Sequence, residues 1–291
     1  MKKTMRYLIG AFGLAWILQV LAGLLFRQGN SLAYSALLSG SMFAPLLAAA
    51  VSRPGLRQLG WRPCIRKNVG WLLAAWFLPA VLGTIGAALY FWLMPGAWDT
   101  SFAYGAALLG AEGLRQMESS GLSMPVYAGI SLVSAVTYAP FINMIPALGE
   151  EVGWRCTLYP ILKARLGVLR GRIFGGIIWG VWHWPIMLLA GYEYGTTYWG
   201  APVTGPLLFC GITVAMGILF DFLYEKTDSI WVPALCHGAI NAFAGVPTFF
   251  LNPAYADKLI LGPLPVGLIS GLPLIAAAVA VSINRKEKMP Q

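Results

Sequence analysis

The sequence predicts an all-α polytopic membrane protein, a helical bundle with about eight transmembrane helices. Hydrophobic residues make up 58% of the 291 residues, charged residues make up only 11%, and the mean hydropathy is +0.69. Soluble domains carry about 25% charged residues. The apolar residues also form long runs, each close to the roughly 20 residues that a helix needs to cross a bilayer.

Eight apolar runs follow one another along the chain. They cover residues 7–26, 31–51, 69–94, 125–147, 173–192, 204–224, 230–249 and 263–283. Pro and Gly interrupt the second and seventh runs, so these two helices are expected to be the least regular. The longest polar connections are 95–124 and 148–172. No separate soluble domain is expected.

The positive charges predict how these helices are oriented. Cytoplasmic loops of membrane proteins carry an excess of Lys and Arg. With eight helices, 17 of the 20 Lys and Arg residues fall on the side of the two termini, and only Arg27, Arg115 and Lys258 fall on the other. Both termini are therefore expected in the cytoplasm of a bacterial cell, with the protein in the plasma membrane. The first run is expected to be a retained signal-anchor helix.

The remaining composition narrows the classes of function. The net charge of +9 follows from the loops, so no nucleic acid partner is expected. None of the four cysteines are spaced as CxxC, which argues against a disulfide framework or a structural zinc site. The absence of a visible internal repeat argues against a transporter built from repeated halves. The pairs Gly176/Gly180 and Gly267/Gly271 predict close packing of helices.

Ionisable residues inside or at the ends of apolar runs mark the candidate site. The segment ALGEEVGWR contains two adjacent glutamates, Glu150 and Glu151, in a chain with only 11 acidic residues. Glu151 and Arg155 are four residues apart and are expected to form an ion pair on one helix face. Glu150 points about 100° away and is left free. In the alternative interpretation, both glutamates hold arginines at the cytoplasmic boundary, for instance Arg155 and Arg172.

Both histidines of the chain lie in apolar runs. Trp179 and His183 share one helix face, and His237 and Asn241 share another, because each pair is four residues apart. A single histidine in such a run is as often a packing residue as a functional one. Two histidines in such runs, together with the pair of carboxylates, predict a single water-filled pocket in the cytoplasmic half of the membrane. Both histidines and Glu150 are expected to line it.

These side chains suit hydrolysis by an activated water molecule. Glu150 is expected to take a proton from a water that His183 helps to position, after which the water attacks a peptide carbonyl. His237 and Asn241 are expected to donate hydrogen bonds to the oxyanion, and Glu150 passes its proton to the leaving amine. This chemistry needs no cofactor. The alternative is a zinc ion held by Glu150, His183 and His237.

Other hydrolytic designs are not matched by the sequence. The zinc-protease motif HExxH and the serine-nucleophile motif GxSxG are both absent. The aspartates lie in loops or at the ends of apolar runs, so two facing aspartates are not expected. Cys236 and His237 are neighbours on a helix and point about 100° apart, so they do not form a catalytic pair.

The pattern resembles the CAAX-protease and bacteriocin-processing (CPBP) family, whose eukaryotic relative is the type II CAAX prenyl endopeptidase. Three motifs of the family occur in order: EExxxR at Glu150, Glu151 and Arg155, an aromatic residue before a histidine at Trp179 and His183, and HxxxN at His237 and Asn241. One departure is Cys156, where many relatives have Gly. The resemblance covers about residues 140–245.

The resemblance implies an intramembrane glutamate protease that cleaves a peptide bond near the cytoplasmic membrane face. The first Glu and the first His activate water, and the second His and the Asn hold the oxyanion. The chain then divides into N-terminal helices without motifs (1–124), a catalytic core (125–249), and a last helix with a basic tail (250–291).

The expected partners are a peptide or protein substrate, which a membrane anchor can hold nearby, and the lipid bilayer. Bacterial relatives are linked to bacteriocin processing and self-immunity. The alternative function is therefore a non-catalytic membrane scaffold or bacteriocin-immunity factor that binds a peptide in the same cavity.

Overall fold

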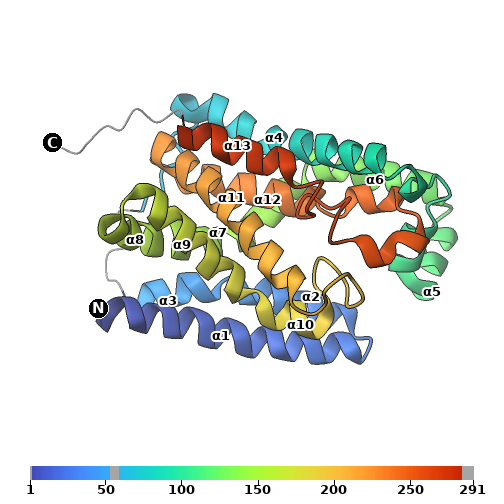
Figure 1. Ribbon diagram of the computed structural model, residues 1–291, viewed down its shortest axis with the longest axis horizontal. Coiled ribbons are helices and arrows are strands. Elements are labelled where there is room, and N and C mark those ends of the chain that lie inside the picture. The colour runs from blue at the N-terminus through green and yellow to red at the C-terminus, as the bar shows by residue number, and fades with distance from the viewer. Residues whose placement is uncertain (1, 53–58, 284–291) are drawn as a thin grey trace.

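The computed structural model describes residues 2–52 and 59–283, and these residues form helices and loops with no β-strand among them (Figure 1). The prediction of an all-α membrane protein is confirmed. The basic tail after the last helix, together with Arg53 and Arg57, lies outside the described residues.

The α-helices of the first half of the chain include two that are long enough to cross a bilayer without a break. They are α1 (Lys2–Arg27), α2 (Ser31–Ser41), α3 (Ala44–Ser52), α4 (Ile65–Leu93), α5 (Ala103–Ser119) and α6 (Met124–Val136). The helix α5 lies within the connection 95–124 that the apolar pattern left without structure, because its sequence is too polar to count as an apolar run.

The second half of the chain contains the candidate site and is built from shorter pieces. Its α-helices are α7 (Ala139–Gly153), α8 (Tyr159–Leu166), α9 (Val168–Trp182), α10 (Trp184–Ala190), α11 (Thr204–Thr227), α12 (Trp231–Phe243) and α13 (Leu272–Ile283). Short helical turns occur in both halves: η2 (Pro95–Ala97) between α4 and α5, and the π-helix η3 (Trp154–Leu158), η4 (Val246–Phe250) and η5 (Pro253–Lys258) in the second half.

The number of eight spans is not confirmed. Within the described residues, five stretches are long and apolar enough to cross a membrane, and a sixth is added if α5 and α6, bent by 96°, count as one span. The five are Lys3–Arg27, Ser31–Ser52, Ile65–Leu93, Val168–Ala190 and Thr204–Thr227. The predicted run 125–147 is divided between α6 and α7, where Pro140 follows the break at Thr137 and Tyr138.

The last two predicted spans are also interrupted. The helix α12 has 13 residues and α13 has 12, which at about 1.5 Å per residue is shorter than a bilayer core of about 30 Å. Pro247 follows α12, and the segment 262–271 before α13 contains three glycines and two prolines. These residues favour turns over a continuous helix.

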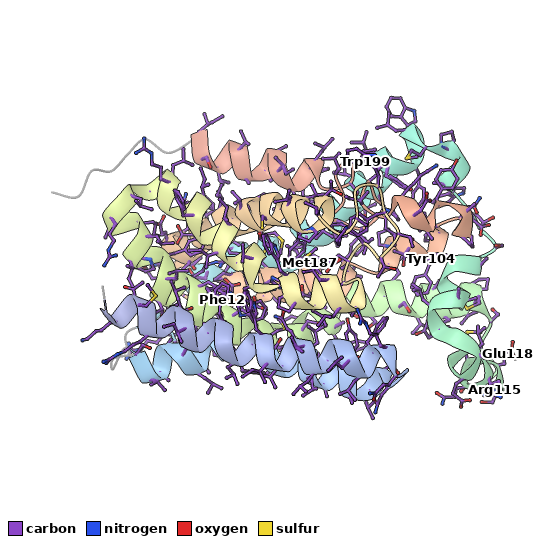
Figure 2. All side chains as sticks on the ribbon, turned by 60° about the horizontal axis from the view of Figure 1, so that its bottom comes forward. Phe12, Tyr104, Arg115, Glu118, Met187 and Trp199 are labelled. Atoms are coloured by element: carbon purple, nitrogen blue, oxygen red, sulfur yellow. The ribbon has the colours of Figure 1, made fainter. Side chains whose placement is uncertain are left out.

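The helices run back and forth along the long axis of the molecule, with α1 beside α3, α9 beside α11, and α12 packed on α7 and α4 (Figure 1). The start of α1 and the end of α13 lie toward the same end. Arg115 and Glu118, on α5, lie at the opposite end, whereas Phe12 and Met187 lie near the middle (Figure 2). Which end faces the cytoplasm stays a prediction.

Two glycines allow α9 and α11 to approach closely. A Cβ atom added at Gly176 would lie 2.4 Å from the Cα of Val214, and one at Gly180 would lie 2.7 Å from the Cα of Cys210. The predicted packing role of this glycine pair is confirmed. The pair Gly267/Gly271 lies in the loop before α13, so its role is in a turn rather than in helix packing.

Candidate active site

The two adjacent glutamates lie in the last turn of α7, just before the π-helical turn η3. The amide of Tyr159 donates to the carbonyl of Trp154, five residues earlier, which is the π-helical spacing. Pro160 has no N–H to donate to the carbonyl of Cys156, so a regular α-helix cannot continue through this point. Single π-turns of this kind are frequent at functional sites.

A glycine brings α12 against α7. A Cβ atom added at Gly238 would lie 2.5 Å from the amide nitrogen of Met144 and 2.5 Å from the carbonyl oxygen of Pro140. Only glycine allows this approach of the two backbones. The contact places the neighbouring residue, His237, beside the glutamates of α7.

Glu151 binds two partners. One carboxylate oxygen lies 2.9 Å from Nε of Arg155, and the other lies 2.9 Å from Nδ1 of His237. The predicted ion pair of Glu151 with Arg155 is confirmed. Because a carboxylate only accepts hydrogen bonds, Nδ1 of His237 carries the proton. The contact therefore fixes the orientation of the imidazole and leaves Nε2 free of Glu151.

The guanidinium group of Arg155 is fully buried among aromatic rings. Its central carbon lies 4.7 Å from the ring centre of Tyr159, 4.7 Å from that of Trp179 and 5.2 Å from that of Phe220. Cation–π contacts are stronger where the cation has lost its water. The rings and the Glu151 carboxylate together compensate the charge of this arginine.

Glu150 is held by neutral donors. Its Oε2 accepts hydrogen bonds from the indole of Trp179 at 2.5 Å and from the indole of Trp154 at 3.2 Å. Among the ion pairs of the described residues none involves Glu150, and Arg172 pairs instead with Asp221 at 2.6 Å. The alternative in which Glu150 and Glu151 hold Arg155 and Arg172 is therefore wrong.

The ring of His183 is held at the end of α9. Its Nδ1 lies 2.9 Å from the carbonyl oxygen of Trp179, and because a carbonyl only accepts, Nδ1 donates this bond. In the neutral imidazole Nε2 is then an acceptor. Trp179 also touches His183 and His237 with its ring, at centroid distances of 6.1 and 5.3 Å. One indole thus contacts Glu150 and both histidines.

Asn241 lies one helical turn beyond His237 on α12 and is half-buried. Its side chain makes no hydrogen bond with the described residues. The structure thus gathers Glu150, His183 and His237 around Trp179 and leaves the carboxamide without a partner. Its role as an oxyanion donor stays a prediction.

The part of the chain that holds this site is similar to known proteins. Residues 131–243 match the family model described as type II CAAX prenyl endopeptidase Rce1-like. This range contains all three motifs and runs from α6 to α12. The chain is also 28% identical, over 103 residues, to the CAAX prenyl protease 2 of Methanococcus maripaludis.

Over residues 131–243 the chain is therefore similar to the CPBP family. The alignment with the archaeal relative covers 35% of this chain and 37% of the relative. The matched part is the part that holds the candidate site, and the helices α1 to α5 lie outside the match to the family model.

In this protein the candidate residues form a closed cluster. The exposed fractions of Glu150, His183 and His237 are 1%, 8% and 4%. Two cavities lie elsewhere in the described protein, one beside α4 and α13 and one between α5, α6 and α12, and neither is lined by these three residues. The predicted water-filled pocket around them is therefore not found in either cavity.

The same three residues do not form a preformed metal site. Nδ1 of each histidine is already engaged, and Oε2 of Glu150 accepts from two indoles. Within 2–52 and 59–283, no three His, Cys, Asp or Glu side chains are grouped in a way that suits a metal ion. Nε2 of both histidines and the second oxygen of Glu150 are not engaged in these contacts, and metal-bound histidines usually donate their other ring N–H in this way. The alternative zinc site therefore stays a prediction.

A buried ion-pair network lies where α8, α9 and α11 meet. Asp221 accepts from Nζ of Lys163 at 2.7 Å and from Nε of Arg172 at 2.6 Å. Glu225 accepts from the same two cations, at 2.8 and 3.0 Å. Asp221 lies near the end of the apolar run 204–224, and the network accounts for its complete burial.

Three residues of the cluster were missed by sequence reasoning. Trp154 lies four residues after Glu150, so their shared helix face was a usable signal. Tyr192 stacks on His183 with an angle of 9° between the rings, and Phe220 stacks on His237 with an angle of 25°. Tyr192 and Phe220 come from a loop and from α11, and no spacing rule connects them with the motifs.

Glu193, in the loop after α10, is expected to make the stability of the fold depend on pH. Loss of contact with water raises the pKa of Glu193 to about 7, partly offset by a hydrogen bond from Tyr192. A carboxyl whose pKa is higher in the folded state stabilises the fold below its usual pKa, and this stability is lost as the pH rises to about 7. Glu193→Gln is therefore expected to raise Tm at pH 8 and to leave it unchanged at pH 4, as measured by thermal unfolding in detergent. An equal effect at both pH values would contradict this explanation.

Proposed function

We propose that the chain is an intramembrane endopeptidase of the glutamate type. The observation that carries the proposal is the different use of the two adjacent glutamates. Glu151 binds Arg155 and His237, whereas Glu150 is held by two indole N–H groups and has no ion pair among the described residues. A buried carboxylate without a cation is suited to accept a proton.

In the proposed reaction, Glu150 takes a proton from a water molecule while Nε2 of His183 accepts the second hydrogen bond of that water. The new hydroxide attacks the carbonyl carbon of a peptide bond and forms a tetrahedral oxyanion. Protonated Glu150 then transfers the proton to the leaving amine as the C–N bond breaks. General-base catalysis of this kind is typically worth about 10²–10⁴-fold in rate.

The oxyanion is stabilised by His237 and Asn241 in this mechanism. Because Nδ1 of His237 donates to Glu151, Nε2 donates to the substrate only when the ring is an imidazolium. The carboxylate of Glu151, 2.9 Å away, stabilises this cation. The proposed mechanism therefore uses a neutral ring at His183 and an imidazolium at His237. Each oxyanion donor is worth about 2.7–4 kcal/mol.

The proposed setting is a plasma membrane with both termini in the cytoplasm and the cleaved bond near the cytoplasmic face. It is supported by the distribution of Lys and Arg and by the position of Arg115 at the end opposite the start of α1. The proposed substrate is a peptide or protein, anchored in or near the membrane. The name of the archaeal relative, CAAX prenyl protease 2, makes a prenylated C-terminal peptide the first substrate to offer.

The second candidate is a non-catalytic scaffold or bacteriocin-immunity factor that binds a peptide. The observation that favours it is the closed cluster, in which Glu150 is only 1% exposed. A cleavage assay separates the two functions, because a scaffold leaves every offered peptide intact.

The experiment is a peptide library offered to the purified protein, with and without a chelator. We expect cleavage at one type of bond, and we expect the rate to stay within about twofold in the presence of EDTA or 1,10-phenanthroline, because no metal takes part in the proposed steps. Loss of cleavage under chelation, restored by added zinc, would contradict the metal-free mechanism. No cleavage of any peptide would favour the scaffold.

A further inference from the structure

A cavity of about 390 Å³ lies between α5, α6 and the end of α12. Small residues form part of its lining, among them Ala135, Ala139, Ala242 and Gly245. Leu108, which is 63% exposed, forms part of its rim. The cavity is therefore an open apolar groove on the side of the bundle where α5 and α6 meet.

One wall of the groove carries a row of hydroxyl groups. Tyr127, Ser131 and Ser134 line it, and their spacing of four and three residues places them on one face of α6. None of their hydroxyls has a hydrogen-bond partner among the described residues. In apolar surroundings an unpaired hydroxyl costs free energy. A hydrocarbon chain cannot pair with them, whereas the N–H and C=O groups of a peptide backbone can.

The groove lies farther along α12 than the candidate active site. Ala242 follows Asn241 on α12 and lies five residues after His237, which is about 7.5 Å along the helix. An extended peptide covers about 3.3 Å per residue. Two or three residues of an extended peptide cover this distance along the helix axis, and the peptide also passes around α12, because Ala242 and His237 point about 140° apart.

We propose that this groove binds the substrate polypeptide, as an extended segment with apolar side chains adjoining the scissile bond. The inference rests on the proposed protease function and adds the part of the protein that selects the substrate. The small residues of the lining accept the apolar side chains, and the hydroxyls of α6 bind the backbone.

Gly245 offers a way to fill the groove without disturbing the fold. Its backbone has φ −80° and ψ −14°, which any residue adopts, and an added Cβ atom meets nothing within 4 Å. Gly245→Leu therefore places a side chain in the groove. Gly129→Leu is the matched control, because Gly129 lies on α6 outside the groove lining and its Cβ also meets nothing within 4 Å.

The test is capture of peptides by protein in nanodiscs, in a Glu150→Gln background so that bound peptides stay intact. The probe is a pool of decapeptides of mixed apolar sequence, and the retained peptides are counted by mass spectrometry. We expect Gly245→Leu to reduce retention at least tenfold and Gly129→Leu to leave it unchanged. We expect Ser131→Ala with Ser134→Ala to reduce it roughly fivefold or more, because two hydrogen bonds are lost.

Equal retention by Gly245→Leu and Gly129→Leu would overturn the proposal. The proposal would also fail if the protein without either substitution retained no peptide. The groove would be a lipid site instead if phospholipid co-purifies with the protein that keeps Gly245 and is lost only in Gly245→Leu, while peptide retention stays unchanged. Peptides that are retained through the groove but never cleaved by the wild type would refute the protease and leave the groove standing. Cleavage that depends on Glu150 but is unchanged by Gly245→Leu would support the protease function and refute the groove as its substrate site.

Discussion

Glu150→Gln is expected to lower kcat for peptide cleavage by about 10²–10⁴-fold, the usual contribution of a general base. The carboxamide oxygen of Gln still accepts hydrogen bonds from the indoles of Trp154 and Trp179, so the fold is expected to be preserved. The measurement is the single-turnover rate on the best peptide from the library, together with Tm of both proteins.

Glu112→Gln is the matched control. Glu112 is exposed on α5, at the other end of the molecule, and its carboxylate pairs with Arg115 and Gln116 of the same helix. The same substitution there is expected to leave kcat unchanged. If Glu150→Gln keeps more than half of the wild-type rate, Glu150 is not the general base.

Arg155→Met is expected to destabilise the protein by about 3–5 kcal/mol, the cost of removing one partner of a buried ion pair. The substitution leaves the Glu151 carboxylate buried and removes the cation from the rings of Tyr159, Trp179 and Phe220. The measurement is Tm in detergent, supported by the yield of folded protein.

Arg115→Met serves as the comparison, since it breaks an exposed pair with Glu112. Exposed pairs contribute little to stability because water screens both charges. Similar shifts in Tm for the two arginine variants would show that the buried ion pair of Arg155 contributes no more to stability than the exposed pair of Arg115.

The fold class was predictable because it depends on composition and on the length of apolar runs. The number of spans was not, because three of the runs contain local breaks whose effect depends on packing. Pro140 follows a break in the run 125–147, and the segment 262–271 forms turns before α13. An apolar run shows that a segment avoids water, but not whether it crosses the bilayer in one helix.

The candidate site was predictable where its residues share a helix. The spacing of Glu151 and Arg155 predicted their ion pair, and the 100° rotation of Glu150 predicted that it would be left out. The contact between Glu151 and His237 joins residues 86 positions apart and depends on the close approach at Gly238. No spacing rule reaches across two helices, so the orientation of His237 by Glu151 required the structure.

The closed state of the cluster also could not be read from the sequence. Residue types predicted a polar pocket, but the aromatic rings of Tyr192, Phe209 and Trp182 pack around His183 and fill the space. Whether water reaches polar residues inside a helical bundle depends on the aromatic rings that pack beside them. Aromatic residues are so frequent in this chain, at 13%, that their positions carry no signal of their own.

The measurement that bears most directly on the mechanism is a double-mutant cycle between Glu150 and His183, with kcat/KM determined for Glu150→Gln, His183→Ala and the combination. If both side chains act on one water molecule, the double variant is expected to be no slower than the slower single variant, since residues that act as a unit show such non-additivity. Rate losses that multiply in the double variant would contradict the shared water and, with it, the proposed active site.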